Sequence, residues 1–251
     1  MTETLVQVHD LTVEFPGQKL FNHLSFNIDR GEFLSVIGEN GVGKTTLIRT
    51  LLHQVKPTHG EIKFRSAVNI GYVPQFRNID RDYPLSIRDF VALNLQESRL
   101  PWLTKKERQQ LDKILQETGL VEIQNTRMGR ASGGQKQRAY LAQALVDQPD
   151  LLILDESTAS LDSVRKYELF DLVQHFNRRH GLNGIINYAR FRLMKKYSDK
   201  YLLLKEDRYA LGEVSDIHSE EDLPNFSFEF MQDAYIAGTF IPLFVGLWES
   251  T

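Results

Sequence analysis

The chain has 251 residues, of which 41% are hydrophobic, and its 30 Lys and Arg residues against 33 Asp and Glu give a formal net charge of −3. This composition is typical of a globular protein with a buried core, and the slightly acidic balance gives no indication of nucleic-acid binding. The absence of cysteine excludes disulfides and thiolate metal sites and fits a reducing cytosol. We expect neither a secretory signal nor a membrane span, because no apolar stretch reaches the roughly 20 residues that a spanning helix needs.

Residues 4–29 are dominated by alternating apolar and polar side chains, with a Pro-Gly turn signal at 16–17. Two alternating runs, 5–8 and 11–15, precede the turn, and a third, 24–28, follows it. Alternation with a period of two is the pattern of half-buried β-strands. We therefore predict antiparallel strands that lie beside the core formed by the rest of the chain.

A glycine-rich loop, GENGVGKTT at 38–46, follows the apolar run 33–37 and leads into a helix-like segment, 45–52. This is the G-x-x-x-x-G-K-[ST] phosphate loop, in which glycines let backbone N–H groups surround phosphate oxygens at a helix start. We expect Lys44 to neutralise charge on the β- and γ-phosphates and the Thr45 hydroxyl to bind Mg²⁺. The candidate nucleotide contacts are Gly38, Glu39, Asn40, Gly41, Val42, Gly43, Lys44, Thr45 and Thr46. The motif predicts a protein that binds a nucleoside triphosphate.

Two positions outside the loop are further candidates. Phe15 lies just before the first turn, and its spacing fits both stacking on an adenine ring and ordinary core packing. A turn at 57–60 and a strand at 61–64 then precede the stretch 68–75, which closes with GYVPQ and is predicted to be a buried strand that ends in the proline. Gln75 follows the carboxyl end of this strand, which is the edge where open α/β sheets bind ligands.

Residues 76–130 change to charged, helix-forming sequence, with segments at 86–95 and 104–118. The second segment opens with a capping box, from Thr104 to Glu107, and stops at a glycine. These features indicate a helical insertion between two parts of the α/β core.

A second glycine-containing loop, ASGGQ at 131–135, leads into a strong helix-forming run. Ser132 is a natural N-cap, and the two glycines that follow keep side chains away from the helix start. The loop is therefore either a second anion-binding helix N-terminus or a simple capped loop.

The aliphatic run DLLILDE at 150–156 ends in two acids. A continuous apolar run predicts a central parallel strand, and carboxylates at its carboxyl end would face the phosphates. We expect Asp155 to hold the Mg²⁺ shell and Glu156 to polarise an attacking water.

Five motifs follow one another along the chain, namely GENGVGKTT, Gln75, ASGGQ, LLILDE and the Ser-Leu-Asp at 160–162. In their order and spacing the chain resembles the ATP-binding-cassette (ABC) transporter ATPases, over about residues 4–213. The resemblance implies an α/β phosphate-loop NTPase core, a mostly parallel sheet flanked by helices, with an N-terminal antiparallel β subdomain. It also implies an α-helical subdomain inserted at about 76–149. The chain would then consist of an ABC ATPase domain at 1–213 and a C-terminal tail at 214–251.

The resemblance further implies that two copies pack head to tail, with each ATP between the phosphate loop of one chain and the ASGGQ signature of the other. By this resemblance Phe15 stacks on adenine, and Glu156 is the general base. The catalytic set is Glu156, Gln75 and Lys44, and the Mg²⁺ set is Thr45, Gln75 and Asp155. The residues that contact nucleotide from the signature side are Ser132, Gly133, Gly134, Gln135 and, across the dimer interface, Asp162.

The implied partners are an integral-membrane permease, whose coupling helix the helical insertion receives, and an extracellular solute-binding protein. They would hold the chain at the cytoplasmic face of the cell membrane, and no nucleic-acid partner is expected. Tail residues 225–239 resemble the start of permeases from zinc/manganese-type importers, and with GYVPQ they point to metal-ion import. The tail is either a broken fusion of neighbouring genes or an authentic amphipathic segment that packs on the domain.

Four residues depart from the family pattern. Ala131 replaces a leucine and Ser157 a proline, and both changes are mild. Ala189 stands where the family's switch histidine is expected, counting back from the landmark at 197–199, and Arg190 takes the usual acidic place beside it. Loss of such a contact typically costs about 10²–10⁴ in rate. We therefore expect intact ATP binding and impaired hydrolysis, unless the alignment is displaced by a few residues or a neighbouring side chain substitutes.

Three functions thus compete. The first is the energising ATPase subunit of a metal-ion importer. The second is an ATP-binding but hydrolysis-impaired regulatory or relic subunit, which Ala189 and the unusual tail favour. The third is a soluble ABC ATPase that acts on ribosomes or DNA, which the single cassette and the lack of a long coiled-coil insertion disfavour.

Overall fold

The computed structural model describes residues 3–65, 68–74, 79–95, 102–155, 163–187, 191–205, 208–219 and 222–223, apart from the side chains at 18, 19, 163 and 164. The chain divides into two units, Met1–Ile217 and His218–Thr251. The described helices and strands all lie in the first unit. Within the described ranges, no helix is both long and apolar enough to cross a membrane.

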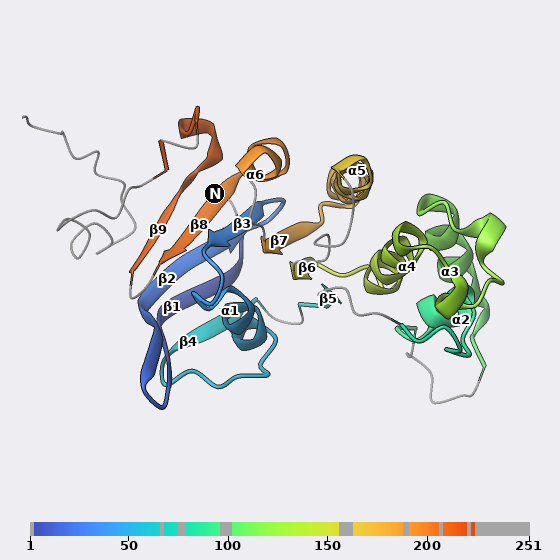
Figure 1. Ribbon diagram of the computed structural model, residues 1–251, viewed down its shortest axis with the longest axis horizontal. Helices are drawn as coiled ribbons and strands as arrows, with labels where there is room; N and C mark the ends of the chain where they lie inside the picture. Colours follow the sequence, from blue (N-terminus) through green and yellow to red (C-terminus); the bar gives the residue numbers. More distant parts are fainter. Residues whose placement is uncertain are drawn as a thin grey trace, which may run out of the picture. The chain divides into compact units, whose positions relative to one another are not determined.

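The first sheet is antiparallel and is formed from the amino-terminal part of the chain (Figure 1). Its strands, in the order β2-β1-β4, are β1 (Thr4–Phe15), β2 (Gln18–Asp29) and β4 (His59–Phe64). The predicted antiparallel strands are confirmed, and the runs 5–8 and 11–15 form one long strand with irregular register. Alternate apolar residues of β1, such as Val6 and Val8, are buried.

The second sheet has six strands in the order β5-β6-β7-β3-β8-β9. In chain order they are β3 (Phe33–Gly38), β5 (Ile70–Val73), β6 (Leu151–Asp155), β7 (Asn183–Asn187), β8 (Lys200–Lys205) and β9 (Arg208–Glu213). Neighbouring strands pair in parallel, except that β9 runs antiparallel to β8. Every residue of β6 and β7 is buried, as is typical of central strands covered on both faces. The predicted mostly parallel α/β sheet is confirmed.

The helices fall into two groups. Helices α1 (Lys44–Leu51), α5 (Ser163–His180) and α6 (Phe191–Tyr197) follow strands β3, β6 and β7 in the chain. Helices α2 (Ile87–Ala92), α3 (Lys105–Glu117) and α4 (Gly133–Leu145) pack on one another, with α4 also against β5 (Figure 1). Single 3₁₀ turns are η1 (Val121–Ile123), η2 (Met128–Arg130) and η3 (Val214–Asp216).

Side-chain hydrogen bonds mark the start of α3 and follow the end of α2. At α3 the predicted capping box is confirmed, because Thr104 Oγ1 accepts from the Glu107 N–H at 3.2 Å and Glu107 Oε2 accepts from the Thr104 N–H at 2.6 Å. Helix α2 ends at Ala92 rather than at the predicted residue 95. The chain leaves the helix there, and Asn94 Nδ2 donates to the carbonyl of Gln143 in α4 at 2.9 Å.

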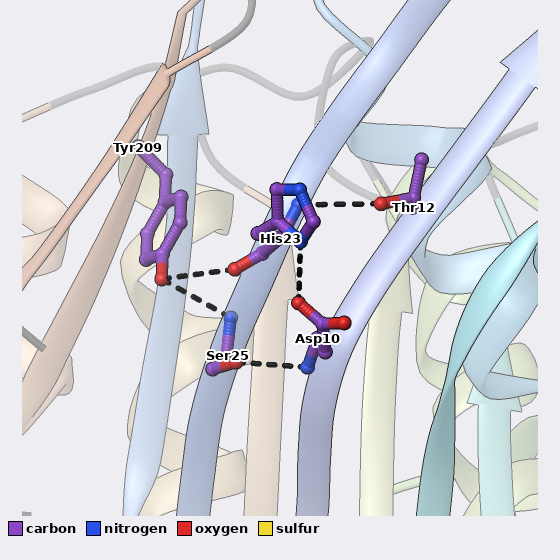
Figure 2. Close-up of polar contacts among 5 residues, drawn as sticks. All are labelled: Asp10, Thr12, His23, Ser25 and Tyr209. Carbon is purple, nitrogen blue, oxygen red and sulfur yellow. Dashed lines mark hydrogen bonds and ion pairs between the residues drawn. The ribbon is translucent and has the colours of Figure 1, made fainter. Parts of the chain in front are cut away.

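A bulge in the antiparallel sheet joins it to the second sheet. Asp10 and His23 both have positive φ angles, 53° and 54°, and His23 Nδ1 lies 2.5 Å from Asp10 Oδ1. The hydroxyl of Tyr209 on β9 accepts from the Ser25 N–H at 3.2 Å and donates to the His23 carbonyl at 3.3 Å (Figure 2). These bonds link β9 to β2 at the irregular part of the ladder.

Alternate residues of the central strands point into two different hydrophobic cores. On β6, Leu151 and Ile153 belong to the core shared with α1 and the antiparallel sheet. Leu152 and Leu154 belong to the core shared with α2, α3, α4 and α5. Because both faces of the sheet are covered, the strand is apolar throughout, and its polar residues are confined to its ends.

Close packing at Gly184 of β7 gives a test of this arrangement. A Cβ at Gly184 would lie 2.1 Å from Cε1 of the Phe33 ring. We expect Gly184→Ala to lower the free energy of unfolding by about 1–3 kcal/mol, because the ring must move to admit the methyl group. Gly133→Ala is the matched control, since a Cβ there meets nothing within 4 Å. Urea unfolding followed by circular dichroism measures both, and an unchanged stability of Gly184→Ala would contradict the packing.

Candidate nucleotide-binding site

The carboxyl ends of three neighbouring strands bring polar residues to one edge of the parallel sheet. Strand β7 lies between β3 and β6, and Asn187 is in register with Val36 of β3 and with Asp155 of β6. Because parallel strands end at the same edge, the loop after β3 and the acid at the end of β6 meet there.

The phosphate loop curls tightly between β3 and α1. Gly43, at φ 106°, is the N-cap of α1, and a Cβ there would lie 2.9 Å from the Phe21 ring. A Cβ on Gly38 would lie 2.4 Å from the carbonyl oxygen of Leu204. Both positions therefore require glycine. The N-cap residue Gly43 has no side chain with which to cap α1, which leaves the first N–H groups of the helix for an anion.

Lys44 lies across the loop that precedes it. Its side chain is 4% exposed, and Nζ donates to the carbonyls of Gly38 and Glu39, each at 2.8 Å. The ammonium group is thus held inside the curve of the loop, where a phosphate would be enclosed. Of the other loop residues, Glu39, Asn40 and Gly41 are exposed, and Gly38, Val42, Gly43, Thr45 and Thr46 are half-buried.

Asp155 is the acid at the centre of this edge, and it is 2% exposed. Its Oδ1 accepts from Asn187 Nδ2 at 2.8 Å and lies 3.5 Å from the Thr45 hydroxyl. Its Oδ2 accepts from the Tyr72 hydroxyl at 3.3 Å. A carboxylate and a hydroxyl this close are the hard oxygen donors that Mg²⁺ prefers, so the residues present fit the ion.

Sequence reasoning did not single out Tyr72 or Asn187 as site residues. Tyr72 lies near the carboxyl end of the half-buried strand β5, and Asn187 ends the buried strand β7. This position in the sequence could have identified them, because a polar residue at the end of an apolar strand lies at the ligand-binding edge of the sheet.

The ASGGQ loop lies on a different part of the fold. Ser132 N-caps α4 in a capping box, with its Oγ accepting from the Gln135 N–H at 3.3 Å and its N–H donating to Gln135 Oε1 at 2.8 Å. Ser132 and Gly133 are exposed, Gln135 is half-buried and Gly134 is buried beside Arg165. Helix α4 packs on α2, α3 and β5, whereas α1 packs on β3 and β6.

Phe15 is 46% exposed at the end of β1, where it pairs with Gln18 across the turn. The core-packing alternative for Phe15 is therefore wrong, because a core aromatic would be buried. Four other candidate positions, Gln75, Glu156, Asp162 and Ala189, lie outside the described residues, as does Ser157.

Among the residues that the structure describes, no group of three or more His, Asp or Glu side chains could hold a metal ion. His175 and His180, on α5, are exposed.

A parallel sheet that carries a phosphate loop and an acid at the same edge defines a phosphate-loop nucleotide-binding protein. A family model described as ABC transporter matches residues 21–159. The zinc import ATP-binding protein ZnuC of Pseudomonas entomophila is 30% identical over 234 residues, which cover 93% of this chain and 86% of that protein.

Two solved structures are similar as well. A metal-chelate type ABC transporter in an inward-facing conformation has a TM-score of 0.80 at 25% identity, covering 88% of each chain. CbiO1 of Clostridium perfringens, part of the ABC transporter complex cbiONQ, has a TM-score of 0.75 at 29% identity, covering 85% of this chain and 90% of that one. The chain belongs to the ABC transporter family and is one of its ATP-binding subunits.

The position of Lys44 predicts its effect on ATP binding. We expect Lys44→Ala to weaken ATP binding about 10–100-fold, because a hydrogen bond to a charged group is typically worth about 1.5–3 kcal/mol. Isothermal titration calorimetry with ATP and Mg²⁺ measures the change. Lys63→Ala is the control, since Lys63 is 61% exposed on β4 and pairs with Glu61. Equal affinities of the two variants would contradict the assignment of Lys44.

Proposed function

We propose that this chain binds and hydrolyses ATP to power an ABC importer of metal ions, zinc or manganese, as one half of a head-to-tail homodimer. The observation that carries the proposal is the meeting of Lys44, Thr45 and Asp155 at one edge of the sheet. The ATPase domain is residues 1–213, with the helical subdomain at about 76–149 inserted in it and the tail at 214–251 appended.

Different residues of the site bind the phosphates, the adenine, the metal ion and the attacking water. The N–H groups of the loop and Lys44 bind the phosphates, and Phe15, which is exposed, stacks on the adenine. Thr45, Asp155 and Gln75 hold Mg²⁺, which when bound neutralises charge on the β- and γ-phosphates. Glu156, which directly follows Asp155, orients the attacking water as general base.

The second half of the site comes from the other copy of the chain. The start of α4, with Ser132 and Gly133 exposed, is open to a ligand outside its own subunit. The resemblance to the family assigns this surface, from Ser132 to Gln135, to the partner's ATP, together with Asp162. Its separation from the phosphate loop in the fold supports a site that two chains complete.

The partner in the membrane is a permease that docks on the inserted helical subdomain. Large hydrophobic side chains are exposed there, namely Leu93, Trp102 and Val121, at 44%, 62% and 43%. These side chains supply apolar surface that a contact with the permease would bury. An extracellular solute-binding protein completes the importer, and the chain sits at the cytoplasmic face of the membrane. The zinc importer and the metal-chelate transporter among its relatives support a metal substrate.

A second candidate is a subunit that binds ATP but hydrolyses it poorly, and Ala189 in the place of the switch histidine favours it. We expect the purified chain to hydrolyse Mg-ATP slowly and Ala189→His to be at least about tenfold faster, because a positioned acid–base typically contributes 10²–10⁴-fold. Phosphate release measures both rates, with Glu156→Gln as the inactive control. If the unmodified chain hydrolyses ATP quickly and the Ala189→His variant is no faster, Ala189 is not at the switch position. That result would contradict the second candidate function.

Docking on a permease gives a separate test. We expect Trp102→Asp to lower the fraction of the chain that sediments with membranes of its native host at least about fivefold, because a charge on an interface core opposes its burial. His59→Asp places the same charge on an exposed position of β4, outside the helical subdomain, and should leave sedimentation unchanged. Quantitative immunoblotting of pellets and supernatants gives the fractions. Equal sedimentation of the two variants would contradict docking through this subdomain.

A further inference from the structure

Asn187 is a buried amide whose two ends have different surroundings. It ends strand β7, is 2% exposed, and donates from Nδ2 to Asp155 Oδ1 at 2.8 Å. Its Oδ1 is also buried, and it has no hydrogen-bond partner among the residues that the structure describes. A buried polar atom without a partner is uncommon, and it usually marks a water, an ion or a functional contact.

The chemistry of Asp155 fixes the orientation of this amide. An ionised carboxylate can only accept hydrogen bonds, so the NH₂ group of Asn187 must face it. The carbonyl oxygen must then point away from Asp155, where it can only accept. Rotating the amide would place two acceptors against each other, so the unpaired oxygen cannot be removed by a flip.

Asn183, at the other end of the same strand, shows the contrast. It is equally buried, at 2% exposed, but its Oδ1 accepts from the Gly31 N–H and its Nδ2 donates to the Asp150 carbonyl at 2.6 Å. Both ends of that amide therefore have partners within the chain. Asn183 and Asn187 lie about 13 Å apart at the usual rise of a strand, so only Asn187 is at the nucleotide edge.

We propose that Asn187 is a positioning residue for the metal ion of Mg-ATP. Its Nδ2 fixes the rotamer of Asp155, and its Oδ1 accepts a hydrogen bond from a water molecule in the coordination shell of the ion. Mg²⁺ keeps several waters when it binds to proteins, and the ion polarises their O–H bonds, which makes them strong donors. This inference rests on the proposed ATP-binding function of the same site.

The neighbours of Asp155 support this role. The Tyr72 hydroxyl donates to Oδ2 and the Asn187 amide to Oδ1, so both carboxylate oxygens are oriented by neutral donors. Neutral donors leave the negative charge of the carboxylate for a cation. Asn187 differs from Tyr72 in that it also presents an acceptor, which is the group that a metal-bound water requires.

Metal affinity tests the proposal without relying on turnover. In the purified full-length chain with the non-hydrolysable analogue adenylyl imidodiphosphate, electron paramagnetic resonance of free Mn²⁺ gives the Mn²⁺ affinity, Mn²⁺ standing in for Mg²⁺. We expect Asn187→Val to weaken Mn²⁺ binding about tenfold or more, as loss of an outer-shell partner typically does. Binding of the analogue without metal should stay within twofold.

Asn183→Val is the matched control, with the same change on the same strand. We expect it to lose thermal stability, because two buried hydrogen bonds are removed, and to keep the Mn²⁺ affinity of the unmodified chain. If Asn187→Val does not fold, Asn187→Ala takes its place in the same titration.

The outcomes separate the two levels of the proposal. If the unmodified chain binds the analogue and Mn²⁺, and the folded Asn187 variant binds Mn²⁺ within twofold of it, the role of Asn187 is overturned. An equal loss of Mn²⁺ affinity in the Asn183 variant overturns it as well, because the effect would then be general to the strand. If the unmodified chain does not bind the analogue at all, the proposed ATP-binding function itself fails.

Discussion

Parallel pairing of β7 with both β3 and β6 is the constraint on which the rest of the site depends. It places Val36, Asn187 and Asp155 in one register line, so that the loop after β3 begins beside the acid that ends β6. Strand β6 is apolar on both faces and is flanked by Asp150 and Asp155, so a slip of one residue would draw one of these acids into the apolar packing. Packing in the two hydrophobic cores therefore fixes the register of the strands, and the register fixes the positions of the site residues.

At that edge the polar groups are positioned by the protein itself. Lys44 is held by the carbonyls of its own loop, and Asp155 by Tyr72 and Asn187. Buried charges are costly unless hydrogen bonds compensate them, and these bonds supply that compensation. A phosphate and its metal ion would enter a site whose donors and acceptors are already directed, which lowers the reorganisation needed on binding.

The inserted helices serve a different purpose from the sheet. Helices α2, α3 and α4 share one hydrophobic core with the face of the sheet that carries Leu152 and Leu154. The start of α4 is exposed and has its own capping box. Because Ser132 and Gln135 cap the start of α4 by themselves, the ASGGQ loop needs no ligand to be stable. The N-terminus of α4 can therefore face another subunit. The exposed Trp102 and Leu93 belong to the same inserted segment. Contacts with a second copy and with a permease would thus converge on one subdomain, which offers a route for coupling them.

The sequence by itself determined the features that depend on neighbouring residues. Alternation along 4–29, the apolar runs of β3 and β6, the capping box at Thr104, the N-cap at Ser132 and the phosphate loop were all readable from local pattern. Only the tertiary structure decided which residues far apart in the chain meet. It paired Asp155 with Asn187 and Tyr72, and it left Phe15 exposed, because strand order and burial depend on long-range packing that local periodicity does not encode.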